Sequence, residues 1–134
     1  MLRPATAADF RRLLEIRDAA GDDALSDPLE IMADDLARLI DAGRVSVWDV
    51  EGRAVGFAAI DGAAIKLLVD SAHRGAGAGR ALLADACARV KAAGHGMAML
   101  VVAGGADSGR HYRAAGWTAA GESEYGGLVL QKPL

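Results

Sequence analysis

The pattern of hydrophobic and polar positions divides the chain into segments of strand and of helix periodicity. Residues 2–4 are expected to form a short first strand. The apolar positions that follow recur three and four residues apart, which predicts a helix that ends at about Ala20. Thr6 and Asp9 have the spacing of a capping pair, so we expect the helix to begin there. Its apolar face comprises Phe10, Leu13 and Leu14.

A second helix is predicted between Asp27 and Gly43. Asp27 supplies an N-cap carboxylate, Pro28 suits the first helical position and Glu30 lies in the first turn. Gly43 is expected to end the helix, because glycine is the usual residue just beyond a helix C-terminus. The predicted apolar stripe consists of Met32, Leu36, Leu39 and Ile40.

Three short apolar runs follow, and their tight connections predict an antiparallel meander. The connections are the dipeptides Glu51-Gly52 and Asp61-Gly62. Asp-Gly between two apolar runs is a strong short-range signal for a hairpin. The three predicted strands cover residues 44–50, 54–60 and 63–69.

The second half of the chain alternates helix and strand. A helix over 77–93 separates the last meander strand from an apolar run at 97–102, which predicts one parallel βαβ unit with a right-handed crossover and a buried second strand. A short helix and two closing strands are expected at 107–115, 117–119 and 128–131. The sequence therefore predicts an α/β fold with a mixed central sheet and about four flanking helices, in one domain over 1–134.

Composition narrows the class of protein. Cys87 is the only cysteine among 134 residues, which excludes an intrachain disulfide, and no Cys/His spacing suggests zinc, so we expect no metal. The first residues lack the uninterrupted apolar stretch of a signal peptide, and no stretch approaches membrane-spanning length, so we expect a cytoplasmic protein without membrane contact. A net charge of −3 argues against a nucleic-acid partner.

The stretch between residues 67 and 83 carries the strongest chemical signal. Gly75, Gly77 and Gly79 alternate where a predicted strand gives way to a helix. The N–H groups of a first helical turn, together with the helix dipole, favour phosphate binding at such an entrance. The local charge between residues 66 and 80 is +2, from Lys66, Arg74 and Arg80 against Asp70. An anionic ligand is therefore expected there.

Other phosphate-binding motifs fit less well. A Walker loop requires Gly-Lys-Ser/Thr, whereas Arg80 and Ala81 follow Gly79. A dinucleotide-binding fingerprint spaces its glycines 1-3-6 after the first strand of a parallel fold, and here the spacing is 1-3-5 after an antiparallel meander. The remaining alternative is structural: small residues at the helix start serve only to let it pack closely.

The residues here resemble the GNAT superfamily of N-acetyltransferases. Arg74, Gly77 and Gly79 match its pattern Arg/Gln-x-x-Gly-x-Gly/Ala, and Val69 matches the valine that ends the preceding strand. The stretch 112–117, Tyr-Arg-Ala-Ala-Gly-Trp, matches a second pattern, Tyr-x-x-x-Gly-Phe, with Trp for Phe. The order of predicted elements agrees too, so the resemblance covers nearly the whole chain.

The resemblance implies a cofactor site between two splayed strands. Pantetheine would lie along the strand that ends at Val69, and the backbone N–H of Leu67 would polarise the thioester carbonyl. Tyr112 would be the general acid that protonates the departing thiolate, the alternative being that it only packs. The implied acetyl-CoA-binding residues are Leu67, Leu68, Val69, Arg74, Gly75, Ala76, Gly77, Ala78, Gly79 and Arg80.

Two features depart from the family pattern. Gly105 and Ser108 stand where many members carry Asn and Ala beside the pantetheine, so a side-chain contact is not expected there. Ala63 stands where some members carry a base glutamate. Glu51, Asp61 and Glu124 could act as base through a water, and His111 more remotely; alternatively, the amine loses its proton to solvent before it binds.

The implied reaction is transfer of acetyl from acetyl-CoA to a primary amine by direct attack. Two alternatives stay open: a CoA-binding or regulatory module with weak catalysis, and a transferase for a protein N-terminus or lysine. Eight carboxylates between Asp18 and Asp41 would attract a cationic acceptor, or they form a solvated helix face. The resemblance implies a small-molecule or peptide amine as acceptor, and it suggests a homodimer formed through the closing strands.

Overall fold

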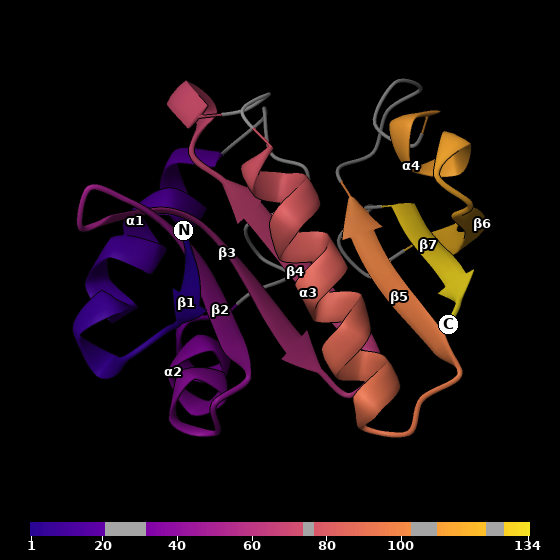
Figure 1. The fold of residues 1–134 in the computed structure, drawn as a ribbon, viewed down its shortest axis with the longest axis horizontal. Helices are drawn as coiled ribbons and strands as arrows, with labels where there is room; N and C mark the ends of the chain where they lie inside the picture. The colour runs from indigo at the N-terminus through magenta and orange to yellow at the C-terminus, as the bar shows by residue number, and fades with distance from the viewer. Residues whose placement is uncertain (21–31, 74–76, 103–109, 123–127) are drawn as a thin grey trace.

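The computed structural model describes residues 1–20, 32–73, 77–102, 110–122 and 128–134. These residues form a seven-stranded sheet with the strand order β1-β2-β3-β4-β5-β7-β6 (Figure 1). The strands are β1 (Leu2–Pro4), β2 (Val45–Val50), β3 (Arg53–Asp61), β4 (Ala64–Val69), β5 (Met97–Val102), β6 (Thr118–Glu122) and β7 (Leu128–Pro133). The helices are α1 (Phe10–Ala20), α2 (Ala33–Asp41), α3 (Ala78–Ala92) and α4 (Arg110–Ala114), with 3-10 turns η1 (Ala7–Asp9) and η4 (Ser71–His73).

The predicted fold class is confirmed. Strands β1 to β4 pair in antiparallel order, β4 and β5 are parallel, and β5, β7 and β6 are again antiparallel. The first predicted capping pair is present, since the Thr6 N–H donates to the Asp9 carboxylate at 2.8 Å. The second hairpin turns one residue later than expected, because Asp61 already pairs with Ala64 across the loop.

Two expectations about apolar surfaces need correction. The described part of the second helix begins at Ala33, because Met32 has an extended backbone (φ −75°, ψ 148°), and residues 27–31 lie outside the description. Met32 is therefore not on the buried stripe and is 48% exposed. The β5 run is buried on one face only, since Met97 and Met99 are 37% and 38% exposed.

Each face of the sheet carries its own hydrophobic cluster. Alternate residues of β3 show the division: Phe57 and Ala59 belong to the cluster with α1 and α2, while Ala58 and Ile60 belong to the cluster with α3. Successive side chains in a strand point to opposite faces, so α3 covers one face and α1 and α2 cover the other.

Strands β4 and β5 are paired over a short length only. Their register comprises Ala64 with Met99 and Ile65 with Leu100. By contrast, β5 pairs with β7 over six positions, from Met97 to Val102. The second half of β4 therefore runs on without a ladder to β5, as the resemblance implied for the two central strands.

Candidate functional site

The backbone of β4 presents alternate residues to the β5 side. The Asp70 N–H bonds to the Val55 carbonyl at 2.7 Å. Because bonded residues alternate along an antiparallel ladder, this bond determines which residues of β4 are hydrogen-bonded to β3. Residues 64, 66 and 68 then bond to β3, and the N–H and C=O groups of Ile65, Leu67 and Val69 point the other way. The Met99 N–H bonds to the Ala63 carbonyl at 2.9 Å, which agrees with this alternation.

The predicted strand residues can offer a ligand only their backbone. Leu67, Leu68 and Val69 are 1%, 0% and 4% exposed. The side chains of Leu67 and Val69 pack in the α3 cluster, and that of Leu68 packs on the α1 and α2 side. Where β4 and β5 have separated, the edge at residues 67 and 69 has the orientation that an added extended segment needs.

The start of α3 has the geometry expected of an anion-binding entrance. Gly77 is the N-cap, with φ +90°, a left-handed conformation that side-chain-bearing residues rarely adopt. The first intrahelical bond runs from the Ala81 N–H to the Gly77 carbonyl at 3.0 Å. Ala78 is buried, Gly79 is half-buried and Arg80 is exposed. Arg74, Gly75 and Ala76 lie outside the described residues.

A network that the sequence did not reveal fixes the end of β4. Arg12 on α1 donates from Nη2 to the Asp70 carboxylate at 3.0 Å and from Nε to the Ala54 carbonyl at 2.9 Å. Burial raises the pKa of the Asp70 carboxyl, but the Ala72 N–H and the Arg12 guanidinium outweigh it and hold that pKa below the ordinary range. Asp70 is therefore ionised at neutral pH.

Gly56 on β3 is a second residue that the sequence gave no reason to select. A Cβ atom there would lie 3.2 Å from the Leu68 carbonyl oxygen, from Leu82 Cδ1 and from Val69 Cγ2. The absence of a side chain lets α3, through Leu82, pack closely over β3 and β4. Helix α3 therefore approaches the sheet closely at this point.

Tyr112 lies on α4 and is 6% exposed. Its side chain belongs to the same cluster as the side chains of Leu67 and Val69, on the α3 side of the sheet. Burial raises the pKa of its phenol above the ordinary value. The Tyr112 carbonyl accepts hydrogen bonds from the N–H groups of Ala115 and Trp117, at 2.9 and 3.1 Å, which ties α4 to the start of β6.

The candidate bases are dispersed. Asp61 is engaged by Arg38 at 3.3 Å, and its side chain is 51% exposed. Glu51 lies in the turn between β2 and β3, with φ +54°. Ala63 precedes β4 and is half-buried. Glu124, and the two positions that depart from the pantetheine pattern, Gly105 and Ser108, lie outside the described residues.

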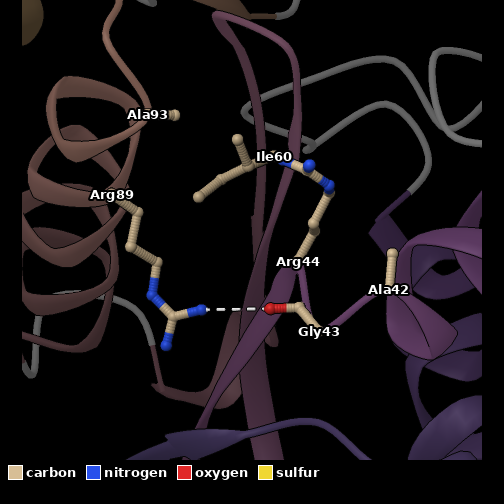
Figure 2. A pocket seen from close by; sticks show the side chains of 6 residues that line it. All are labelled: Ala42, Gly43, Arg44, Ile60, Arg89 and Ala93. Carbon is tan, nitrogen blue, oxygen red and sulfur yellow. Dashed lines mark hydrogen bonds between the residues drawn. The ribbon is translucent and has the colours of Figure 1, made fainter.

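A surface hollow of about 230 Å³ lies at the other end of the sheet, between the α2–β2 connection and the C-terminus of α3. Figure 2 shows Arg89 reaching across it to the Gly43 carbonyl, with an N–O distance of 3.4 Å. Helix α3 separates the hollow from Gly77 by about 22 Å, given its 15 residues and the α-helical rise. No predicted site residue lines it; its lining is Ala42, Gly43, Arg44, Ile60, Arg89 and Ala93.

The described residues contain neither a cluster suited to a metal ion nor a helix suited to a membrane span. No three His, Cys, Asp or Glu side chains among these residues gather as they would around a metal ion. None of the described helices has the length and apolarity needed to cross a membrane.

Comparison with known proteins yields one family and many similar folds. Residues 16–130 match the family model described as an acetyltransferase (GNAT) domain. No curated protein sequence matches significantly.

Three solved structures illustrate the fold, each aligned over 100% of this chain with a TM-score of 0.77. A ribosomal-protein-alanine N-acetyltransferase from Brucella melitensis is 24% identical and is covered over 99% of its length. A phosphinothricin acetyltransferase from Sinorhizobium meliloti, in complex with acetyl-CoA, is 23% identical and covered over 88%. The PaiA N-acetyltransferase from Thermoplasma acidophilum, in complex with coenzyme A, is 14% identical and covered over 98%.

Proposed function

Because the chain belongs to the GNAT family of acetyltransferases, we propose that it transfers acetyl from acetyl-CoA to a primary amine by direct attack. Residues 1–134 would act as one domain, and both substrates would be bound together. The observation that carries the proposal is the divergence of β4 from β5 beyond Ile65 and Leu100, next to a helix entrance formed by Gly77. Solved structures of the same fold with CoA or acetyl-CoA support it.

The residues present fit a thioester that bears a diphosphate. In the proposal, the β5-facing backbone groups of Leu67 and Val69 bind the pantetheine amides, and the first turn of α3 binds the diphosphate, together with Arg80 and the segment 74–76. The N–H of Leu67 would stabilise negative charge on the carbonyl oxygen during transfer. One donor of this kind contributes about 3 kcal/mol to lowering a barrier.

Tyr112 is the proposed general acid. Its burial keeps the phenol protonated at neutral pH, as a proton donor must be. It shares a packed cluster with the strand that would carry the thioester. The proton would pass from the Tyr112 hydroxyl to the sulfur as the C–S bond breaks. No described carboxylate has a clear role as base, so the amine would lose its proton to solvent or through a water.

The acceptor would be a small-molecule or peptide amine. Asp18, Asp34, Asp35 and Asp41 are exposed on α1 and α2, and this charge favours a cationic acceptor. We also propose a cytoplasmic homodimer without nucleic acid or membrane as partner. Cys87, the one cysteine, is a free thiol, which suits a reducing compartment. Strand β6 lies at the sheet edge and is exposed throughout, so it offers a surface for the dimer.

A second candidate function is a CoA-binding module with little catalysis. The observation in its favour is the methyl group of Ala63 where some family members carry a base, together with the engagement of nearby Asp61 by Arg38. A third, acetylation of a protein N-terminus or lysine, differs from the first only in the acceptor.

One experiment separates these functions. Purified protein is titrated with CoA and acetyl-CoA by calorimetry, and thiol release from acetyl-CoA is then followed with panels of small amines and of peptides. An acetyltransferase should bind both nucleotides and release thiol with at least one acceptor class. Binding without release from any acceptor would favour the binding module, and absence of binding would refute all three functions.

A further inference from the structure

We propose that Arg12 is a positioning residue that acts through Asp70 to hold the end of β4 and the 3-10 turn Ser71–His73, which lead to the proposed diphosphate site at the start of α3. The inference rests on the proposed function and assigns a role in it to a residue of the opposite face of the sheet. Arg12 lies on α1, whereas the helix whose entrance it serves, α3, covers the other face.

The guanidinium of Arg12 is directed at the protein itself. Its Nε donates to the Ala54 carbonyl at 2.9 Å, its Nη2 donates to Asp70 Oδ2 at 3.0 Å, and its Nη1 lies 3.4 Å from Glu15. The side chain is 20% exposed. These contacts leave Arg12 suited to fixing Asp70 rather than to binding a ligand.

Asp70 is the junction that Arg12 fixes. Its N–H extends the β3–β4 ladder to Val55, and its carbonyl accepts the His73 N–H at 2.9 Å. Its Oδ1 accepts the Ala72 N–H at 3.3 Å. Asp70 therefore follows the last residue of β4 and also accepts the hydrogen bond that closes the 3-10 turn Ser71–His73.

This junction lies between the two parts of the proposed cofactor site. Val69, the last β4 residue, immediately precedes Asp70, and the N-cap of α3, Gly77, follows the turn by four residues. Four hydrogen bonds of Asp70, one of them from Arg12, and the bond from Arg12 to the Ala54 carbonyl fix where the chain leaves the sheet. Preorganised donors bind an anion more tightly than donors that must be ordered on binding.

Arg12 bonds two different groups, the Ala54 carbonyl and the Asp70 carboxylate, and this makes the arginine difficult to replace. A planar guanidinium can bond a carbonyl and a carboxylate in fixed directions, whereas a lysine ammonium is a single point donor at the end of a flexible stem. Arg12→Lys should thus keep the charge opposite Asp70 and lose the double contact.

The test compares two thioesters that differ in the diphosphate. Arg12→Met and Asp70→Asn are each assayed with acetyl-CoA and with S-acetylpantetheine, which lacks the diphosphate and nucleotide. We expect KM for acetyl-CoA and Kd for CoA to rise about tenfold, equivalent to about 1.4 kcal/mol. Turnover of S-acetylpantetheine should stay within about twofold of wild type, as should KM for the amine.

Arg89→Met is the matched control. Arg89 also bonds a carboxylate, Asp85 at 3.0 Å, and a backbone carbonyl, Gly43 at 3.4 Å, but at the far end of α3. It should lower thermal stability without changing either thioester's KM. The double variant Arg12→Met/Asp70→Asn should bind CoA about as weakly as each single variant, because the two residues act through one contact.

Several results would overturn the proposal. Equal losses for both thioesters, or a loss of stability with unchanged CoA affinity, would show that Arg12 only supports the fold. Should Arg12→Met not fold, Arg12→Lys provides the same comparison. A wild-type protein that binds no CoA would instead refute the proposed function, and this role with it.

Discussion

At the scale of single residues, Tyr112 offers the sharpest test of chemistry. We expect Tyr112→Phe to lower kcat at least tenfold while leaving CoA affinity within twofold, because the substitution removes the proposed acid and keeps the packing. Transfer from a phenol near pKa 10 to a thiolate near 8.5 is uphill by about 2 kcal/mol in water. Burial raises the pKa of Tyr112 further, and it disfavours the thiolate in the same site as well. Steady-state kinetics and calorimetry provide the two measurements.

The pH profile provides an independent check on Tyr112. A general acid must be protonated, so activity that depends on it falls as the pH rises through its pKa. Because burial raises that pKa above its ordinary value, the wild type should show no loss from this group up to about pH 10. An unchanged kcat in the phenylalanine variant would leave Tyr112 with a packing role alone.

The residue scale is also where the sequence was least informative about the site. Tyr112, Gly77 and Gly79 belong to local patterns and could be selected from the sequence. Arg12 and Asp70 are 58 positions apart, and no local spacing signals a bond between them. Arg12 follows another arginine, Arg11, and resembles any exposed helix residue until the fold brings it beside Asp70.

At the scale of elements, Gly77 and Gly79 at the start of α3 belong to the same sequence pattern but have different backbone conformations. Gly77 has φ +90°, so Gly77→Ala should cost about 1–2 kcal/mol of stability and weaken CoA binding. Gly79 is helical, and a Cβ there would lie 3.6 Å from Val69 Cγ2, an ordinary contact. Gly79→Ala should therefore stabilise the protein by about 0.5–1 kcal/mol. Urea denaturation of the pair measures both effects.

The paired variants control for each other, since both add one methyl group within the same turn. A stabilising Gly77→Ala would show that the conformation assigned to Gly77 is wrong, and a destabilising Gly79→Ala would show that the space assigned beside Gly79 is wrong. Loss of CoA affinity in Gly79→Ala alone would place the diphosphate against Gly79 rather than over the turn.

The order of elements was predictable because each has a local cause. The first hairpin turn and the Thr6–Asp9 capping pair are determined by neighbouring residues, and they appear where the sequence indicated them; the second hairpin turns one residue later. Exposure of an apolar side chain depends instead on what packs over it. Met97 and Met99 have the hydrophobicity of a core strand, yet among the described residues their face of β5 is left half-exposed.

At the scale of the whole molecule, the proposed site depends on how two halves of one sheet meet. Local patterns predicted the parallel unit, and only the family resemblance implied that its strands diverge, because strand divergence depends on the packing of distant elements. Helix α3 contacts β3, β4 and β5, so its position on the sheet influences the spacing between strands β1–β4 and strands β5–β7.

Substitution of Gly56 tests how closely α3 must pack on the sheet. A methyl group at position 56 would come within 3.2 Å of the Leu68 carbonyl oxygen, a backbone atom that cannot move aside without disturbing the ladder. Gly56→Ala should therefore push α3 outward, cost about 1–3 kcal/mol in urea denaturation and weaken CoA binding. Gly96→Ala is the control, since a Cβ there meets nothing within 4 Å and should leave both unchanged. A neutral Gly56→Ala would mean that α3 adjusts at no cost, and that its close approach to the sheet does not set the proposed binding geometry.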